Sequence, residues 1–154
     1  MDEESGFDML YRRTGPLLWR AVLAYTGGRR EVTDDVVAEA FARTMARGDA
    51  VRAPERYLYR VAFRLAAQEL RRTPTVASPP DLAATPADDG LGELLDAVRQ
   101  LSPGQRAAVY LRYQGDLPVA QIADLMGTSS ATVRVHLLRG RRRLASLIPG
   151  DDDD

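Results

Sequence analysis

Apolar residues recur at helical spacing near the start of the chain and predict a first helix there. Gly15-Pro16 is expected to kink or split this helix, because proline removes a backbone donor, and Gly27-Gly28 is expected to end it. The apolar positions are Phe7, Leu10, Tyr11, Leu17, Leu18, Ala21, Val22 and Tyr25.

A second helix is predicted over residues 33–47. Thr33 is a suitable N-cap, and Asp34 and Asp35 fall in the first turn, where the helix dipole favours anions. Its buried face is expected to comprise Val36, Val37, Ala40, Phe41 and Met45.

A third helix is predicted over residues 54–72, because proline favours the first helical position and Thr73-Pro74 stops the pattern. Its expected apolar stripe consists of Tyr57, Leu58, Val61, Ala62, Leu65 and Leu70.

The opposite face of this third helix carries arginines four residues apart. Like charges at that spacing repel one another, so the arrangement favours an anionic partner. With exposed Tyr59 and Phe63 beside the arginines, a single-stranded nucleic acid fits, its phosphates on arginines and its bases on rings. The alternative is a solvated basic face with both rings in the core. The candidate residues are Arg56, Tyr59, Arg60, Phe63, Arg64 and Arg71, with Arg72 continuing the surface.

The C-terminal part of the chain predicts a helix-turn-helix. Ser102 and Gln105 form a capping box around Pro103, and that helix is expected to end near Tyr113. A short helix over residues 118–126 is then closed by Gly127. A serine-capped longer helix follows, buried through Val133, Leu137, Gly140 and Leu144.

The exposed face of that last helix is expected to enter the major groove of DNA. Ser129 and Ser130 suit a phosphate at the helix N-terminus, and three successive arginines farther along suit the DNA backbone. His136 is either a donor to a guanine edge or a surface histidine without a role. The candidate DNA-binding residues are Ser129, Ser130, Thr132, Arg134, Val135, His136, Arg139, Arg141, Arg142 and Arg143.

A proline-rich, acidic segment separates the two halves. Residues 73–92 contain four prolines and lack periodicity, which predicts a flexible linker between a module at 1–72 and a module at 93–149, without a large shared core. Residues 98–150 hold eight arginines against two acidic residues, whereas residues 150–154 end in an acidic tail, DDDD. This segregation favours nucleic-acid contact although the net charge of the chain is only −1.

Composition narrows the function further. The 154-residue chain has no cysteine and a single histidine, so thiolate or histidine metal clusters are not expected, and neither is a cofactor. The polar N-terminus and the absence of a long apolar run predict a cytoplasmic protein without a membrane span. No phosphate-binding glycine loop or apolar carboxylate pair supports an enzyme.

The motifs together resemble the extracytoplasmic-function sigma factors of bacterial RNA polymerase. The resemblance rests on TDDVVAEAFART and RYLYRVAFRLAAQELRR in the N-terminal module, and on LSPGQRAAVYLRYQGDLPVAQIAD and SSATVRVHLLRGRRRL in the C-terminal module. It implies an all-α fold with a sigma region-two-like helical bundle and a region-four-like helix-turn-helix, joined by the linker.

This resemblance also implies partners and roles. The helix 33–47 would dock on the clamp helices of core polymerase, the helix 54–72 would trap flipped non-template bases near the minus-ten element, and Arg134, His136 and Arg139 would read the minus-thirty-five element. The expected core-binding residues are Asp34, Asp35, Val37, Ala38 and Phe41. Promoter DNA and core polymerase would be partners; whether an anti-sigma factor also binds stays open.

Departures from the family pattern leave two functions to weigh. Ala38 stands where the family usually has glutamine, Tyr57 where it has tryptophan, Phe63-Arg64 where it has Arg-Asn, and Gln68 and Gln121 where it has acidic residues. The first hypothesis is a sigma factor that directs promoter recognition and transcription initiation. The second is a sigma-like transcriptional regulator that binds DNA or a protein partner without supporting initiation.

Overall fold

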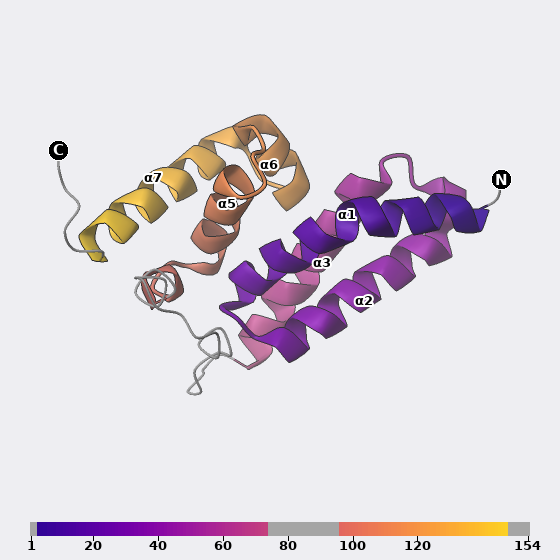
Figure 1. Ribbon diagram of the computed structural model, residues 1–154, viewed down its shortest axis with the longest axis horizontal. Coiled ribbons are helices and arrows are strands. Elements are labelled where there is room, and N and C mark those ends of the chain that lie inside the picture. The colour runs from indigo at the N-terminus through magenta and orange to yellow at the C-terminus, as the bar shows by residue number, and fades with distance from the viewer. Residues whose placement is uncertain (1–2, 74–95, 148–154) are drawn as a thin grey trace.

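The computed structural model describes residues 3–73 and 96–147, and these ranges contain helices and no strand. The all-α fold class is thus confirmed. The N-terminal bundle consists of α1 (Glu3–Thr26), α2 (Arg30–Arg47) and α3 (Pro54–Arg72), with a short 3-10 helix at Gly48–Ala50. After a helical turn at residues 96–99, the C-terminal bundle consists of α5 (Pro103–Tyr113), α6 (Val119–Met126) and α7 (Ser130–Leu147) (Figure 1).

The turn between α1 and α2 depends on two glycines. Gly27 and Gly28 have φ angles of 76° and 94°, a conformation that residues with a Cβ rarely adopt. The helix that follows begins at Arg30, so the prediction of Thr33 as N-cap is wrong. Thr33 is fully buried one turn inside α2, where its hydroxyl donates to the Arg29 carbonyl and lies 3.1 Å from the Thr26 hydroxyl.

The first helix continues past its proline. Pro16 lies inside α1, so of the two outcomes expected at Gly15-Pro16, a kink or a split, the split does not occur. Along the N-terminal bundle, Leu18 and Val22 of α1 are fully buried, as is Leu58 of α3. Met45, expected on the buried face of α2, is 55% exposed instead. It lies one turn beyond the buried Phe41, in the last turn of α2.

The two bundles share one hydrophobic core, so the prediction of modules without a large shared core is wrong. Helix α5 packs along α1, and α6 packs against α3. Leu111 of α5 and Ile122 of α6 are fully buried in the same cluster as Leu18 and Leu58 of the N-terminal bundle. Burial of this apolar surface on both sides is the favourable term that brings the bundles together.

Two arginines join the bundles reciprocally at helix C-termini, where backbone carbonyls lack helical partners. Arg106 of α5 donates to the carbonyls of Ala24 (2.5 Å) and Tyr25 (2.6 Å) at the end of α1, and also to that of Leu101. Arg60 of α3 donates through Nε to the Asp124 carbonyl near the end of α6, at 2.9 Å. In both cases a cation lies at the negative end of a helix dipole in the other bundle.

The predicted linker at residues 73–92 lies outside the described residues except for Thr73, and so does the acidic tail at residues 150–154. Thr73 itself is held at the end of α3. Its carbonyl and hydroxyl both accept hydrogen bonds from the Arg29 guanidinium. The proposed domain boundaries within 74–95 therefore stay predictions.

Candidate nucleic-acid interface

Helices α6 and α7 form the predicted helix-turn-helix. Gly127 ends α6 in the left-handed conformation, with a φ of 71°. The Ser129 hydroxyl then accepts a hydrogen bond from the Thr132 amide at 3.1 Å and caps α7. Ile122 and Val133, both fully buried, hold the two helices together. The local signals read from the sequence are confirmed, including the capping box of Ser102 and Gln105 on α5.

One face of α7 is open to solvent along its N-terminal half. The side chains of Thr132, Arg134 and Arg139 are exposed, and those of Val135 and Leu138 are exposed by 42% and 41%. Apolar side chains of this size on a recognition helix suit the methyl group of thymine, and the arginines suit guanine edges or phosphates. Of these residues, Thr132, Arg134, Val135 and Arg139 were predicted, and they are accessible to solvent; Leu138 was not predicted.

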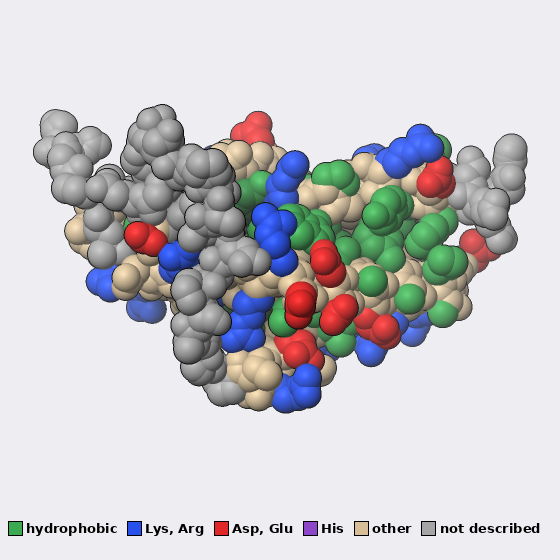
Figure 2. Space-filling model, turned by 60° about the horizontal axis from the view of Figure 1, so that its bottom comes forward, with side chains coloured by type: hydrophobic (Ala, Val, Ile, Leu, Met, Phe, Trp, Pro, Cys, Tyr) green, Lys and Arg blue, Asp and Glu red, His purple; other side chains and the backbone are tan. Residues whose placement is uncertain are grey.

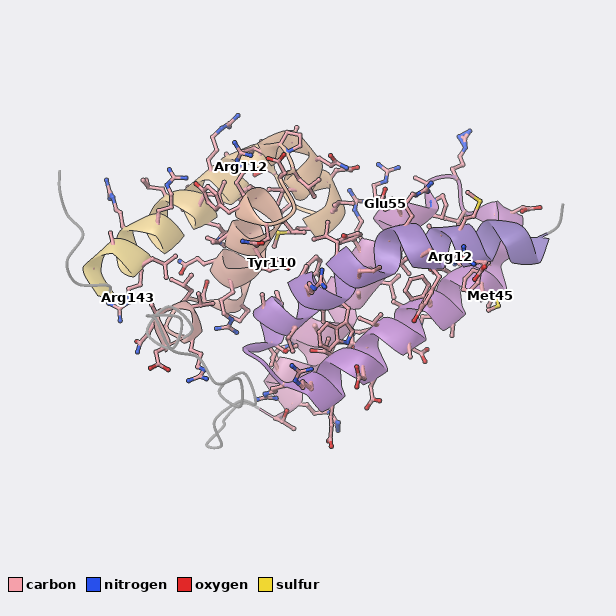
Figure 3. The ribbon with its side chains drawn as sticks, in the orientation of Figure 1. Arg12, Met45, Glu55, Tyr110, Arg112 and Arg143 are labelled. Atoms are coloured by element: carbon pink, nitrogen blue, oxygen red, sulfur yellow. The ribbon has the colours of Figure 1, made fainter. Side chains whose placement is uncertain are left out.

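The three arginines at the end of α7 differ in their surroundings. Arg141 donates to the Tyr113 hydroxyl at 2.8 Å, and Arg143, which lies at the far end of α7, donates to Gln100 at 3.2 Å (Figure 3). Arg142 is exposed and makes no hydrogen bond or ion pair within the described residues. Both bonded arginines remain exposed, so a phosphate would compete only with a neutral partner.

His136 lies at the edge of the exposed face of α7 that is nearest to α5. Its ring packs against the start of α5, where a Cβ on Gly104 would come within 2.8 Å of Nε2. Burial lowers the pKa of His136, and nearby Arg139 lowers it further. The ring is half-buried, and it also lines an open pocket with Thr132, Val135 and Arg139. Whether it donates to a base edge therefore stays a prediction. Only a folded α5 could reveal the packing on Gly104, because Gly104 is 32 residues away in sequence.

A pocket of about 400 Å³ lies at the start of α3. Five arginines line it together with the Tyr57 ring and the loop at residues 50–53. Its size falls in the range of ordinary ligand sites. We call it the arginine pocket; its arginines are Arg47, Arg52, Arg56, Arg60 and Arg64. The guanidinium of Arg47 stacks over Tyr57, 5.3 Å from the ring centroid. Arg47 and Arg52 were not predicted, because they precede α3 and only the turn of the chain brings them alongside it.

Two of the arginines in this pocket are held by the C-terminal bundle. Arg56 Nη1 lies 3.2 Å and Arg60 Nη2 3.1 Å from Asp124 Oδ1. Arg64 makes no hydrogen bond or ion pair within the described residues. Arg71 is exposed at the end of α3, near Tyr25, whose pKa is raised by burial and lowered in part by Arg71.

The two aromatic residues predicted beside these arginines are not exposed. Tyr59 and Phe63 are 1% and 6% exposed and lie in the shared core. Burial raises the pKa of the Tyr59 hydroxyl well above its ordinary value of 10.0. The prediction that both rings are free to stack with bases is therefore wrong, and the alternative that places them in the core is correct. Phe63 still contributes to the wall of a second pocket, of about 490 Å³, between α3 and α7.

The residues of α2 that are expected to bind polymerase fall into an exposed group and a buried group. Asp34, Asp35 and Ala38 are exposed, whereas Val37 and Phe41 are 8% and 6% exposed and support them from below. Asp34 accepts a hydrogen bond from the Trp19 indole at 2.8 Å. Phe41 packs against the rings of Phe7 and Tyr11 of α1. The expectation that Val37 and Phe41 contact polymerase stays a prediction.

An apolar surface adjoins this face of α2. Figure 2 shows hydrophobic side chains gathered toward the N-terminal end, beside a group of acidic side chains. Met9, Tyr11 and Met45 are each more than half exposed. Met45 lies at the end of α2 next to α1 (Figure 3). Exposed apolar side chains bordered by charges are typical of protein-binding surfaces.

Within the described ranges, no group of three acidic or histidine side chains is placed to hold a metal ion. The same residues contain no helix with the length and hydropathy needed to cross a membrane. What the described residues do offer is a set of basic and apolar contact surfaces.

Comparison with known proteins assigns both halves of the chain. Residues 10–74 match the family Sigma-70 region 2, and residues 91–144 match the family Sigma-70, region 4. The ECF RNA polymerase sigma factor SigL of Mycobacterium tuberculosis is 32% identical over 143 residues, covering 83% of this chain and 80% of SigL. The ECF RNA polymerase sigma factor BldN of Streptomyces coelicolor is 28% identical over 166 residues, covering 97% of this chain and 62% of BldN.

A solved structure shares the fold. The sigma factor RpoE of Bartonella quintana, crystallised in complex with the anti-sigma factor NepR, superposes with a TM-score of 0.71 at 18% identity. The match covers 96% of this chain and 99% of RpoE. With both sigma regions matched and SigL similar over most of its length, this chain belongs to the extracytoplasmic-function (ECF) RNA polymerase sigma factors.

Proposed function

We propose that this chain acts in the cytoplasm as a sigma factor, directing core RNA polymerase to promoters and supporting initiation. It would work by binding rather than by covalent chemistry. The observation that carries the proposal is the serine-capped helix α7, whose N-terminal half exposes Arg134 and Arg139 on a helix-turn-helix. Membership in the sigma-factor family supports the polymerase as partner.

The C-terminal bundle is proposed to bind the minus-thirty-five element. Thr132, Arg134 and Arg139 would read base edges in the major groove, while Ser129, Ser130 and the free amides of the first turn would hold a phosphate. Arg142, which has no partner within the described residues, would contact the DNA backbone, with Arg141 and Arg143 exchanging neutral partners for phosphate. His136 would position α7 on α5.

The arginine pocket is proposed to hold the single-stranded minus-ten region. Its five guanidinium groups would neutralise phosphates, and Tyr57, already stacked under Arg47, would be the ring nearest an unstacked base. Tyr59 and Phe63 would stiffen the pocket from the core, and Arg71 would extend the basic surface along α3.

The exposed group of α2 is proposed to dock on core polymerase. Asp34, Asp35 and Ala38 supply the accessible surface, and Met45 extends it with an apolar contact. Val37 and Phe41 would act by holding that group against α1.

A second candidate is a sigma-like regulator that binds DNA without supporting initiation. Two observations favour it. Ala38, at a position where the family usually carries glutamine, is exposed and offers no hydrogen bond. The two bundles also share a core, and Asp124 holds two arginines of the proposed minus-ten surface.

Reconstitution with purified core polymerase separates the two candidates. Promoters would be selected from a random library by run-off transcription, and core binding would be measured by gel filtration. A sigma factor forms a stoichiometric complex and yields transcripts; a regulator binds duplex DNA without transcripts. Ala38→Arg on α2 should abolish core binding, whereas Ala145→Arg, at an exposed position near the end of α7, should preserve it. Core binding unaffected by Ala38→Arg would refute the proposed docking surface.

A further inference from the structure

Asp124 is the acidic residue that links α6 to the basic face of α3. One of its carboxylate oxygens, Oδ1, lies within ion-pair distance of both Arg56 and Arg60, and its backbone carbonyl accepts from Arg60 Nε. Two neighbouring oxygen atoms of one residue thus occupy the Nε and Nη2 groups of a single guanidinium. This bidentate contact has the geometry in which arginine binds a phosphate or a carboxylate.

The position of Asp124 within its own helix makes the contact more notable. It lies three residues before Gly127, in the last turn of α6, where the negative end of the helix dipole disfavours an anion. Nothing in the C-terminal bundle pairs with its carboxylate among the described residues; its ion-pair partners both come from α3. The electrostatic compensation for this carboxylate therefore comes from the arginine pocket.

We propose that Asp124 is an internal phosphate mimic: it occupies the anion position between Arg56 and Arg60, and nucleic acid must displace it to fill the arginine pocket. This inference rests on the proposed function, because it assigns the minus-ten surface a built-in competitor. DNA that makes too few phosphate contacts would leave Asp124 in place. Asp124 would therefore weaken the binding of such DNA to the arginine pocket.

The exposure of these groups makes the displacement reversible. The side chains of Arg56, Arg60 and Asp124 are 46%, 42% and 46% exposed, so water and salt ions reach all three. Exposed ion pairs are weak and are screened by salt. The other link between the bundles differs, because Arg106 is half-buried and donates to backbone carbonyls that no phosphate can replace. Asp124 is thus the contact that a polyanion can break first.

The test measures the affinity of the full chain for a short, fluorescein-labelled single-stranded oligonucleotide of mixed sequence by fluorescence anisotropy. Asp124→Asn keeps the side-chain size but removes the charge, and it should tighten binding by about fivefold at low salt, with the gain shrinking as salt rises. The matched control is Asp116→Asn. Asp116 is an exposed acidic residue of the same bundle, without an ion pair in the described residues, and asparagine tolerates its φ of 56°. This control should change the affinity less than about twofold.

A double-mutant cycle checks that the effect passes through the arginines. In an Arg60→Ala background, Asp124→Asn should increase the affinity for the oligonucleotide much less than it does in the wild-type background. Equal gains from Asp124→Asn and Asp116→Asn would overturn the proposal, since they would reflect net charge alone. A full gain in the Arg60→Ala background would also overturn it. Thermal unfolding midpoints matched between the two asparagine variants exclude a loss of folding as the cause.

A second readout follows the position of α6 directly. The chain has no cysteine, so exposed Ala42 on α2 and Ala120 on α6 can be replaced by cysteine and labelled for energy transfer. Oligonucleotide should lower the transfer in the wild type over the same concentrations that raise anisotropy, and in Asp124→Asn the transfer should fall at lower oligonucleotide concentrations. Oligonucleotide binding without a change in energy transfer would overturn the proposal that nucleic acid displaces Asp124. If no variant bound the oligonucleotide, the proposed minus-ten surface would fail. If the transfer fell over the same oligonucleotide concentrations in Asp124→Asn and in the wild type, the proposed competition by Asp124 would fail while the surface remained.

Discussion

The two arginine-bearing helices, α3 and α7, present their basic side chains to different surroundings. On α7, Arg134, Arg139 and Arg142 are exposed and have no acidic partner within the described residues. On α3, Arg56 and Arg60 are also exposed but are paired with Asp124 from the other bundle. The proposed minus-thirty-five surface is therefore accessible as folded, whereas the proposed minus-ten surface is partly occupied by the protein itself.

This contrast shows how tertiary packing changes the meaning of a similar sequence pattern. Both helices combine an apolar stripe with arginines at helical spacing. Helix α7 is covered on one side only, so its opposite face stays open. Helix α3 is packed by α1 and α2 and also by α6, which buries Tyr59 and Phe63 and brings Asp124 to the arginines.

The largest effect expected from this comparison concerns Tyr59. Tyr59→Ala should lower the free energy of unfolding by about 3–5 kcal/mol, because a fully buried ring is removed from the shared core. Tyr57→Ala should cost less stability, since Tyr57 is only half-buried, but it should weaken single-stranded DNA binding through loss of the ring under Arg47. Urea unfolding and fluorescence anisotropy measure the two effects. A stable Tyr59→Ala protein with lost DNA binding would restore the stacking role that the structure denies.

The next effect concerns the half-buried link between the bundles. Arg106→Ala leaves the carbonyls of Ala24 and Tyr25 without their donor and should destabilise the chain by about 3 kcal/mol. Burial lowers the pKa of Arg106 to about 10, which keeps it charged at neutral pH. Arg112→Ala is the control, because Arg112 makes one longer bond, 3.3 Å, within its own bundle. Similar unfolding midpoints for both variants would contradict the conclusion that Arg106 stabilises the contact between the two bundles.

A smaller effect separates base reading from phosphate contact on α7. Arg134→Ala should cost about 1–3 kcal/mol at preferred sites and relax preference at one base position. Arg142→Ala should weaken binding to all duplexes alike and reduce the slope of log affinity against log salt by about one. Affinities for a preferred and a random duplex at several salt concentrations give both quantities. If the two variants changed sequence preference equally, this division between the arginines would be wrong.

The smallest effect concerns pH. The pKa of His136 in the folded chain lies below its ordinary value of 6.5, so the unfolded chain takes up this proton first as the pH falls. The stability contributed by neutral His136 is thus complete above pH 6.5 and is lost as the pH falls below it. His136→Gln should show a shallower loss of stability between pH 6.5 and about pH 5. Parallel pH curves for the two proteins would show that the ring is free in solution.

The sequence by itself determined several features that depend on neighbouring residues, although the predicted N-cap at Thr33 and the split at Gly15-Pro16 were wrong. The capping box at Ser102 and the glycine turn at Gly127 were predicted because a cap or a turn involves residues within one helical turn of each other. The limits of α3 and the exposed arginines of the recognition helix followed in the same way, from Pro54 and from the apolar period.

Only the tertiary structure decided which faces are shared between the bundles. A proline-rich segment predicted independent modules, yet apolar surface on α1, α3, α5 and α6 is buried in one core, and the spacing of residues within a helix does not reveal a partner far away in sequence. The burial of Tyr59, the packing of His136 on Gly104 and the pairing of Asp124 with Arg60 all follow from that association. The physical reason is that hydrophobic burial is not directional, so the periodicity of a helix shows that a face will be covered but not what will cover it.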